Sequence, residues 1–318
     1  MDGIIVVDKP RGWTSHDVVN RVRRLAGTRR VGHLGTLDPS ATGVLPVVVG
    51  RATRLAQFYA RNDKIYESVI HFGYSTDTYD ADGERTSDER AVVLDAGALE
   101  MALTRFRGRF DQAPPPVSAK KVGGRPAYEL ARKQQTVELS PVPVEVYSLD
   151  LLRVEGCEAE VRVHCSAGTY LRSIAHELGQ ILGSGAFLKN LRRTASGDFR
   201  IESARTLDDL GALADEDRLG EALIPASQLL PEFPSEIVDS ITAGQIRNGR
   251  DFRISPFQAR RGARFVKAVT AQGDLVAIGE ARLPHLYHPV VVLDTSLPKT
   301  SSSAASGDKH TPEWTGEG

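Results

Sequence analysis

The segment His33–Pro46 reads His-Leu-Gly-Thr-Leu-Asp-Pro-Ser-Ala-Thr-Gly-Val-Leu-Pro and sets one carboxylate among glycines and prolines. Glycine permits backbone angles that other residues resist, and Pro39 fixes the chain immediately after Asp38. The apolar run Val44–Val49 follows at once and predicts a strand. Such a loop can hold a single aspartate rigidly at the edge of a sheet. An isolated Asp-Pro pair is more often a turn in which the carboxylate bonds nearby backbone N–H groups.

Further segments on both sides of this loop favour a functional site over a simple turn at Asp38. They are Asp8–Ser15, Lys64–Tyr66 with Gly73–Thr78, Pro114–Lys120 with Ala127–Arg132, Cys165–Arg172 and Gly185–Thr194. Together with His33–Pro46, and in this order, they resemble the motifs of the TruB family of pseudouridine synthases, which modify the T arm of tRNA. The resemblance covers about residues 2 to 200 of the chain.

Composition indicates a globular protein with room for one large domain and a small one. The chain has 318 residues, of which 41% are hydrophobic and 25% charged. It has neither an apolar run of about 20 residues, as a membrane span needs, nor a secretory signal. Its two cysteines, Cys157 and Cys165, are not spaced as metal ligands. We therefore expect a cytoplasmic protein with free thiols, no metal and no cofactor.

Charge is segregated along the chain although the net charge is only −1. Residues 1–66 carry eleven basic and five acidic side chains, and residues 105–133 carry eight basic and two acidic ones. Residues 77–100 carry eight acidic side chains and two arginines. This pattern is consistent with solvated faces of alternating sign. It also fits a basic face that meets phosphates, which the motifs favour.

Hydrophobic periodicity predicts strands and helices without strict βαβ alternation, and therefore an α+β fold. Residues 64–72 alternate like a strand exposed on one side, and Thr14 or Ser15 can cap a helix that follows. Thr169 can cap another helix, from Tyr170 to about Leu182. The resemblance implies a mixed, largely antiparallel pseudouridine-synthase sheet with flanking helices and the catalytic loop in a central cleft.

The chain divides into three predicted regions. Two prolines within Leu229–Pro234 suggest a linker, so residues 1–230 would form the catalytic domain. Residues 231–295 would form a small β-rich domain, for which the resemblance implies a PUA-like RNA-binding module. The alternative is an ordinary structural extension of the catalytic domain. Residues 296–318 have almost nothing to bury and are predicted to be a disordered tail.

Asp38 is the predicted catalytic residue. Forming pseudouridine breaks the N1–C1′ bond of uridine, turns the base and rejoins it through C5, and an ionised carboxylate near the sugar suits this task. The resemblance gives Asp38 that role, either as nucleophile or as base toward the ribose. Arg172 would keep Asp38 ionised and aimed, since a guanidinium pairs with carboxylates and stays charged in a dry pocket.

The remaining candidate residues come from the motif positions and would bind the substrate. Tyr66 would stack on the flipped uracil, because an aromatic face holds a base without a sequence code. Tyr170 and Leu191 would line the uracil pocket. His33 would fill the space left by the extruded nucleotide or contact its phosphates, and Lys9 would contact RNA or brace the catalytic loop. Each of these residue types, taken alone, is more often structural.

Extraction of a base from folded RNA costs a few kcal/mol, least where the nucleotide already lies in a loop. A structured RNA loop is therefore the expected substrate. The candidates for phosphate contacts around the cleft are Lys120, Lys121, Arg125, Arg132, Arg192 and Arg193.

The leading hypothesis is an isomerase that converts a T-arm uridine of tRNA, at position 55, to pseudouridine. It would act on tRNA without a membrane or an obligate protein partner, as a monomer. One alternative is an RNA-binding or RNA-folding module that kept the pocket but lost turnover. Another is an enzyme that acts on guide-directed ribosomal RNA, although the long basic extension of that group is absent from the sequence.

Overall fold

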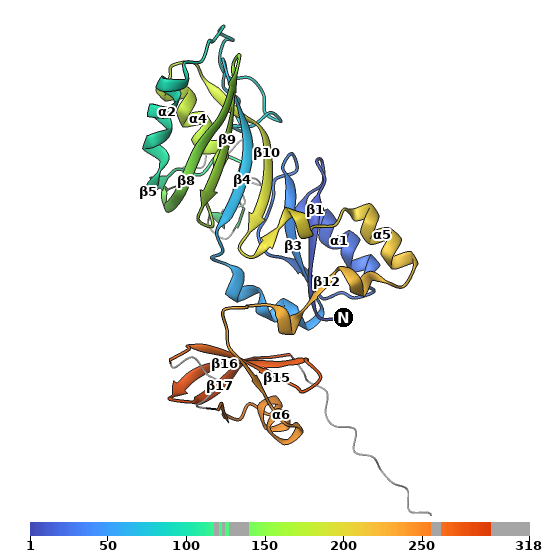
Figure 1. Cartoon of the computed structure of the whole chain (residues 1–318). Coiled ribbons are helices and arrows are strands. Elements are labelled where there is room, and N and C mark those ends of the chain that lie inside the picture. The colour runs from blue at the N-terminus through green and yellow to red at the C-terminus, as the bar shows by residue number, and fades with distance from the viewer. Residues whose placement is uncertain (118–120, 123–124, 127–139, 256–261, 294–318) are drawn as a thin grey trace, which may run out of the picture. The chain divides into compact units, whose positions relative to one another are not determined.

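The computed structural model describes residues 1–117, 121–122, 125–126, 140–255 and 262–293. The chain forms two compact units, Met1–Pro231 and Glu232–Gly318 (Figure 1). The division falls within the proline-containing stretch that suggests a linker. The functional assignment of each domain stays a prediction, and the predicted disordered tail lies outside the described residues.

The first unit is built on a ten-stranded sheet with the order β12-β1-β3-β10-β4-β9-β8-β5, to which β2 and β11 add at β3 and β10. Strands β3 and β10 run parallel, and the other neighbours run antiparallel. The mixed, largely antiparallel sheet that the resemblance implies is thereby confirmed. The strands are β1 Gly3–Lys9, β2 Val31–His33, β3 Thr42–Val49, β4 Lys64–Phe72, β5 Gly108–Gln112, β8 Val142–Glu155, β9 Glu158–Cys165, β10 Ala186–Ser196, β11 Phe199–Arg200 and β12 Leu223–Pro225. A separate short hairpin pairs β6 Lys121–Val122 with β7 Arg125–Pro126.

The parallel contact between β3 and β10 brings the chain that follows Asp38 beside a distant strand. Gly43 pairs with Arg193 at this point and has a φ of 100°. A Cβ atom on Gly43 would lie 2.2 Å from the carbonyl oxygen of Arg193. Only glycine therefore allows the two backbones to approach here.

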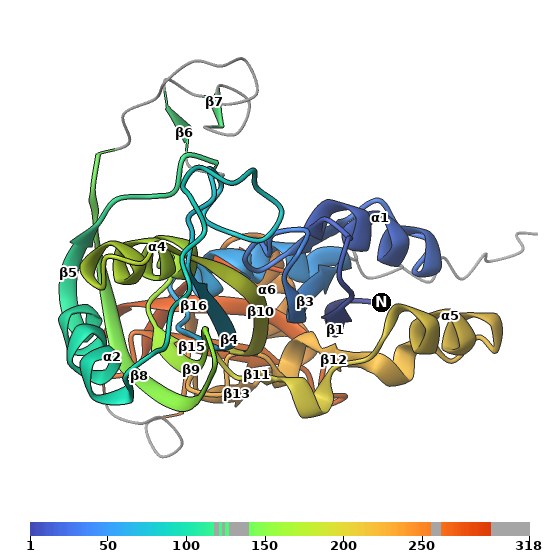
Figure 2. The ribbon, with the colours of Figure 1, turned by 90° about the horizontal axis from the view of Figure 1, so that it is seen from above.

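Helices gather at the two ends of the sheet (Figures 1 and 2). α2 (Ala96–Leu103) and α4 (Leu171–Ile181) pack near β8 and β10, whereas α1 (Ser15–Leu25) and α5 (Leu207–Asp215) pack together near β1 and β3. The first unit also has 3₁₀ helices η1 Gly50–Tyr59, η2 Thr104–Phe106, η3 Ile201–Ser203, η4 Leu219–Ala222 and η5 Ala226–Gln228. No helix among the described residues is long and apolar enough to cross a membrane.

Local sequence signals explain most of these elements. Thr14 caps α1 through a reciprocal capping box with Asp17, as predicted. Strand β4 alternates buried and half-buried residues along its whole length, so the predicted alternating strand is confirmed, although the face expected to be exposed is half-buried. The predicted cap of α4 is wrong by one residue: Tyr170 is the N-cap, without a side-chain bond, and Thr169 precedes it.

The two cysteines occupy contrasting environments near the paired strands β8 and β9. Cys165, at the end of β9, is fully buried in the main apolar core, and burial raises the pKa of its thiol to about 12. Cys157 lies in the turn between the strands and is half-buried, with its sulfur 3.8 Å from Nδ1 of His71. Both thiols are free.

The second unit is a small β-rich domain. Its five-stranded sheet has the order β13-β15-β16-β17-β14, formed by β13 Ser235–Ile237, β14 Phe252–Arg253, β15 Phe265–Val269, β16 Leu275–Leu283 and β17 Leu286–Val292. Helix α6 (Ser240–Arg247) buries Ala243 and Ile246 in a core with the strands. The predicted β-rich C-terminal domain is thus confirmed.

Candidate active site

The loop that carries Asp38 is held by hydrogen bonds from the segment after β1. The hydroxyl of Ser15 donates to the carbonyl of Leu37 at 3.0 Å and accepts from the Leu37 N–H at 2.8 Å. The ammonium of Lys9 donates to the carbonyl of Pro39 at 3.1 Å, and the Gly12 N–H donates to the same carbonyl at 2.8 Å. The residues flanking Asp38 on both sides are therefore fixed to the first strand and helix.

Lys9 uses all of its donors in this way. Its side chain is fully buried and also donates to the carbonyls of Pro10, at 3.0 Å, and Trp13, at 2.6 Å. Burial lowers the pKa of Lys9 to about 8, against the attraction of Asp38. Of the two roles expected for Lys9, contact with RNA and support of the loop, the geometry supports the second.

Arg172 meets Asp38 as expected and also meets a second carboxylate. Its Nε lies 3.0 Å from Oδ2 of Asp38, and its Nη1 lies 3.6 Å from Oδ2 of Asp80. The side chain of Arg172 is 6% exposed, whereas that of Asp38 is 38% exposed. The guanidinium is thus buried behind a carboxylate that remains open to a substrate.

Asp80 belongs to a segment that wraps around the guanidinium. Nη1 of Arg172 donates to the carbonyl of Thr78 at 3.1 Å, and the hydroxyl of Thr78 donates to Asp80 at 2.5 Å. Burial raises the pKa of Asp80, while the Thr78 hydroxyl, Arg172 and the Asp82 N–H act in the opposite direction. These contacts fix the guanidinium from the side away from Asp38.

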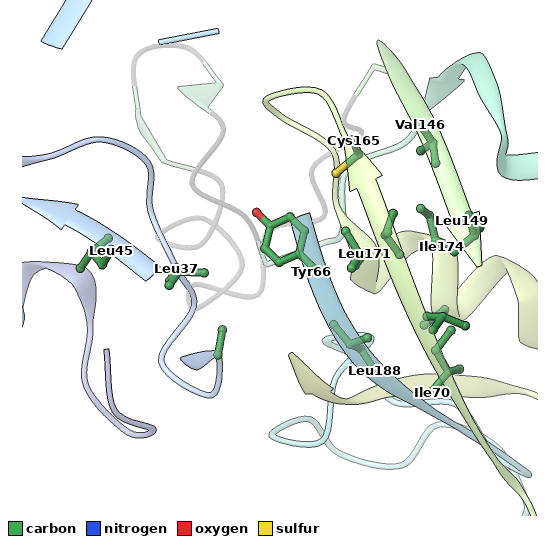
Figure 3. Packing of buried hydrophobic residues seen from close by; sticks show 14 of the residues in the cluster. Leu37, Leu45, Tyr66, Ile70, Val146, Leu149, Cys165, Leu171, Ile174 and Leu188 are labelled. Carbon is green, nitrogen blue, oxygen red and sulfur yellow. The ribbon is translucent and has the colours of Figure 1, made fainter. Parts of the chain in front are cut away.

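A cleft of about 580 Å³ opens in front of Asp38. Asp38, Tyr66, Tyr170, Arg172 and Leu191 all line it, although they come from a loop, two strands and the start of α4. Figure 3 shows the Tyr66 ring on β4 between Leu37, next to Asp38, and Leu171, next to Arg172. The volume suits a nucleoside, and its walls combine aromatic, apolar and charged groups.

Two further cations, Lys64 and Arg193, line the cleft beside Tyr66. Arg193 is 1% exposed and donates to the carbonyls of Val44, at 2.7 Å, Gly35, at 3.1 Å, and Thr36, at 3.4 Å. Lys64 donates to the carbonyl of Asn62, and burial, followed by the charge of Arg193, lowers its pKa. Burial raises the pKa of the Tyr66 phenol, and Arg193 opposes that shift, so the phenol stays protonated at neutral pH.

Tyr170 is positioned through its backbone by a buried amide side chain. The amide nitrogen of Gln112 donates to the carbonyl of Tyr170 at 2.9 Å, and the Tyr170 N–H donates to the amide oxygen of Gln112 at 2.8 Å. Gln112 ends β5 and is 1% exposed. This pair of bonds compensates for the missing side-chain cap of α4 and sets Tyr170 at the cleft.

Comparison with known proteins agrees with this geometry. Residues 23–171 match the TruB family pseudouridylate synthase N-terminal domain, and residues 172–231 match the tRNA pseudouridylate synthase B C-terminal domain. A relative from Solibacter usitatus, named tRNA pseudouridine synthase B, is 64% identical over 92% of this chain and 100% of its own. A protein of the same name from Photobacterium profundum is 37% identical over 92% of this chain and 95% of its own.

This chain belongs to the TruB family of pseudouridine synthases. Among solved structures, a chain of an H/ACA RNP bound to a substrate RNA containing 2′-deoxyuridine matches with a TM-score of 0.67 and 26% identity. That match covers 92% of this chain and 85% of the other chain. The comparisons and the architecture therefore agree on a pseudouridine-synthase fold.

One predicted substrate-binding residue of this TruB-family chain, His33, lies outside the cleft lining. His33, on β2, is half-buried, does not line the cleft, and has its pKa lowered by burial and by the charges of Arg193 and His16. Its role in substrate binding stays a prediction.

Among the phosphate candidates, the prediction for Arg193 is wrong. Its guanidinium is buried and donates hydrogen bonds to backbone carbonyls. Arg192 is 42% exposed and pairs with Asp8 at 2.8 Å. Lys120 and Arg132 lie outside the described residues, and the side chains of Lys121 and Arg125 do too.

Two functional positions, and the role of a third residue, escaped the sequence analysis. Asp80 lies two residues beyond the quoted motif segment that ends at Thr78, so extending that segment would have found it. Gln112 and the bracing role of Arg193 carry no local signal, since both depend on contacts between distant segments. In the part of the chain that the structure describes, no three His, Cys, Asp or Glu side chains gather as metal ligands.

Proposed function

We propose that this chain converts a T-arm uridine of tRNA, at position 55, to pseudouridine, with Asp38 as the catalytic residue. The observation that carries the proposal is the half-exposed carboxylate of Asp38, paired with buried Arg172 and facing the same cleft as Tyr66. A protein that only bound RNA would have no need of this ionised acid. Membership of the TruB family supports the reaction and its tRNA substrate.

The reaction is an isomerisation, so the residues around the cleft suffice for its balance. The N1–C1′ bond breaks, a C5–C1′ bond forms, the proton on C5 leaves and N1 gains one. Asp38 starts this sequence either by attacking the ribose or by removing a proton from it. Both routes need the carboxylate ionised, and the guanidinium of Arg172 at 3.0 Å favours that form.

The cleft must also receive and retain a base that has left its stack. Tyr66 stacks on the flipped uracil, while Tyr170 and Leu191 close the sides of the pocket. Because the Tyr66 phenol is protonated at neutral pH, it can also donate a hydrogen bond to the detached base. Retention matters because free uracil that diffused away would leave an abasic site in the RNA.

The enzyme acts on tRNA without a guide RNA or another protein, as a cytoplasmic monomer. All of the described residues that line the cleft belong to the first unit, which supports activity without a second chain. The solved relative belongs to a ribonucleoprotein, so dependence on a guide is the alternative to be tested.

The test uses purified protein and an unmodified T-arm stem–loop, with no guide RNA and no other protein, followed by chemical mapping of pseudouridine. We expect one product at the target uridine and none when that position is cytidine. Gel filtration of the same sample reports whether the active species is a monomer. No product, or product only after a guide RNA is added, would refute the proposal.

A further inference from the structure

The segment Thr78–Asp80 grips Arg172 at two points but has an unusual backbone between them. Its carbonyl at Thr78 and its carboxylate at Asp80 both approach Nη1 of Arg172, at 3.1 and 3.6 Å. Tyr79 lies between these two groups and has a φ of 64°. Bulky side chains rarely adopt this left-handed region, which costs about 1 kcal/mol or more, so surrounding contacts must hold it.

An aromatic stack supplies such a contact. The ring of Tyr79 lies on the ring of His176 with 3.7 Å between centroids and an angle of 10° between planes. The backbone of Tyr79 is also fixed, because the Leu188 N–H on β10 donates to its carbonyl at 3.0 Å. The segment is thus held on one side by the sheet and on the other by α4.

His176 offers its ring face rather than its nitrogens to this contact. Its Nε2 lies 2.8 Å from the side-chain amide of Gln180, and its Nδ1 is buried without a hydrogen-bond partner among the described residues. Burial lowers the pKa of His176, so the ring is neutral at physiological pH. Since neither nitrogen forms a hydrogen bond with Tyr79, a different aromatic ring would serve equally well.

The helix connects this stack directly to Arg172. Arg172 and His176 are four residues apart on α4, so their side chains project from the same face. The helix therefore meets the segment three times: Arg172 contacts Thr78 and Asp80, and His176 contacts Tyr79 between them. Three contacts fix an orientation that two would leave free to pivot.

We infer that the stack of Tyr79 on His176 is a positioning device that sets the guanidinium of Arg172 against Asp38. Neither residue lines the cleft, so both act through Arg172. The inference rests on the proposed function and adds two positioning residues to it. Loss of the stack between Tyr79 and His176 would slow the chemical step while leaving RNA affinity unchanged.

The test separates the ring from the backbone at each position. Tyr79→Asn keeps a residue that tolerates positive φ but removes the ring, whereas Tyr79→Phe keeps the ring. His176→Leu and His176→Phe form the matching pair. We expect both ring-removing variants to lower the single-turnover rate about tenfold at saturating RNA, with the half-saturating RNA concentration unchanged. Both Phe variants should react like the wild type.

A double-mutant cycle and a control pair complete the experiment. Tyr79→Asn combined with His176→Leu should be no slower than either single variant, because one contact is lost in each case. Tyr147 also packs against a histidine, His164, and neither of these residues lines the cleft or contacts the segment Thr78–Asp80, so Tyr147→Ala should leave the rate unchanged. Losses that multiply, normal rates in ring-removing variants, or an equal loss in Tyr147→Ala would overturn the inference.

Hydrogen exchange tests the stack independently of whether the proposed function is correct. If the wild type makes no pseudouridine, the proposed function fails. The stack is then judged by exchange of the Leu188 amide, which should quicken in Tyr79→Asn and His176→Leu but not in the Phe variants. If the wild type is active and the variants match it in rate and exchange, only the positioning role fails.

Discussion

Arg172 and Arg193 are both buried at the same cleft, yet they are held by different kinds of partner. Arg172 faces the carboxylates of Asp38 and Asp80 and donates to one backbone carbonyl, that of Thr78. Arg193 contacts no carboxylate in these hydrogen bonds and donates to three backbone carbonyls, those of Val44, Gly35 and Thr36. Carboxylates take part in chemistry, and backbone carbonyls determine where a loop lies. Similar burial therefore accompanies two different tasks, one electrostatic and one architectural.

Asp38 itself has both kinds of contact, one electrostatic at its carboxylate and one architectural at the backbone beside it. Its carboxylate meets a charge from α4, which arrives from more than a hundred residues away. Its backbone neighbours are fixed by Ser15 and Lys9, which are close in sequence. Variants of the two groups should therefore fail differently, one in rate and the other in stability or loop order.

The largest effect should come from the carboxylate. Asp38→Asn keeps the size of the side chain but removes its negative charge, so we expect no detectable pseudouridine and unchanged affinity for the T-arm stem–loop. Chemical mapping measures the product and filter binding measures the affinity. Substantial turnover by this variant would contradict the assignment of Asp38.

Arg172→Lys tests the electrostatic side of the comparison. Lysine keeps the charge but cannot reproduce the fork that meets Asp38, Thr78 and Asp80, so the single-turnover rate should fall about 100-fold. Thermal unfolding measured in parallel should change little. A normal rate would show that the geometry of the pair is dispensable.

Arg193→Met tests the architectural side. The variant leaves three backbone carbonyls without their donor, and we expect the free energy of unfolding to fall by about 3 kcal/mol. Urea denaturation followed by circular dichroism measures this loss. The matched control is Arg218→Met, since Arg218 is exposed and should contribute almost nothing. Equal stabilities of the two variants would contradict the bracing role of Arg193.

Lys9 makes the architectural side pH-dependent. Its pKa is lowered by burial from 10.5 to about 8, so raising the pH through about 8 removes one donor from the folded protein. Activity should therefore fall as the pH rises through this value, because one of three carbonyls loses its bond.

Stability should respond to the same titration in the opposite direction. Between about 8 and 10.5 the unfolded chain binds more protons at Lys9 than the folded one, so its contribution to stability rises with pH. That contribution is complete above the unfolded pKa and is lost as the pH falls through the folded one. Rate profiles and urea denaturation of wild type and Lys9→Met measure both effects, and a flat rate profile through pH 8 would exclude the role of Lys9.

The smallest effect should come from Arg192, which is exposed and follows the cleft residue Leu191. If it contacts a phosphate, Arg192→Ala should weaken RNA binding about threefold and reduce the slope of log affinity against log salt by about 1. Arg218→Ala, at a site remote from the cleft lining, should leave the slope unaltered. An unaltered slope for Arg192→Ala would remove it from the RNA interface.

Sequence patterns were informative where a feature depends on neighbours in the chain. The cap at Thr14, the alternation of β4 and the glycine-rich loop at Asp38 are all local, and each could be predicted. Pairing of Arg172 with Asp38 was available only through the resemblance, because no spacing rule links a loop to a helix so far along the chain.

Burial was the main source of error. Arg193 stands beside Arg192 in the sequence, and both look like solvated cations. In β10, Arg193 is buried although Arg192 before it is only half-buried, and Gly43 lets the neighbouring backbone come close enough to enclose Arg193. The burial of Arg193 depends on the parallel pairing of β3 with β10. Parallel strands are joined by long connections, so no local sequence pattern predicts this pairing.

The unequal cysteines give this protein a ready attachment point for a reporter. A thiol with a pKa of about 12 and no accessible surface does not react with maleimides at neutral pH, so Cys165 stays unlabelled. Cys157 in its turn remains reachable, and the chain has no third cysteine. One fluorophore per molecule can thus be introduced into the native sequence, and its anisotropy would follow association with RNA without altering any residue of the cleft.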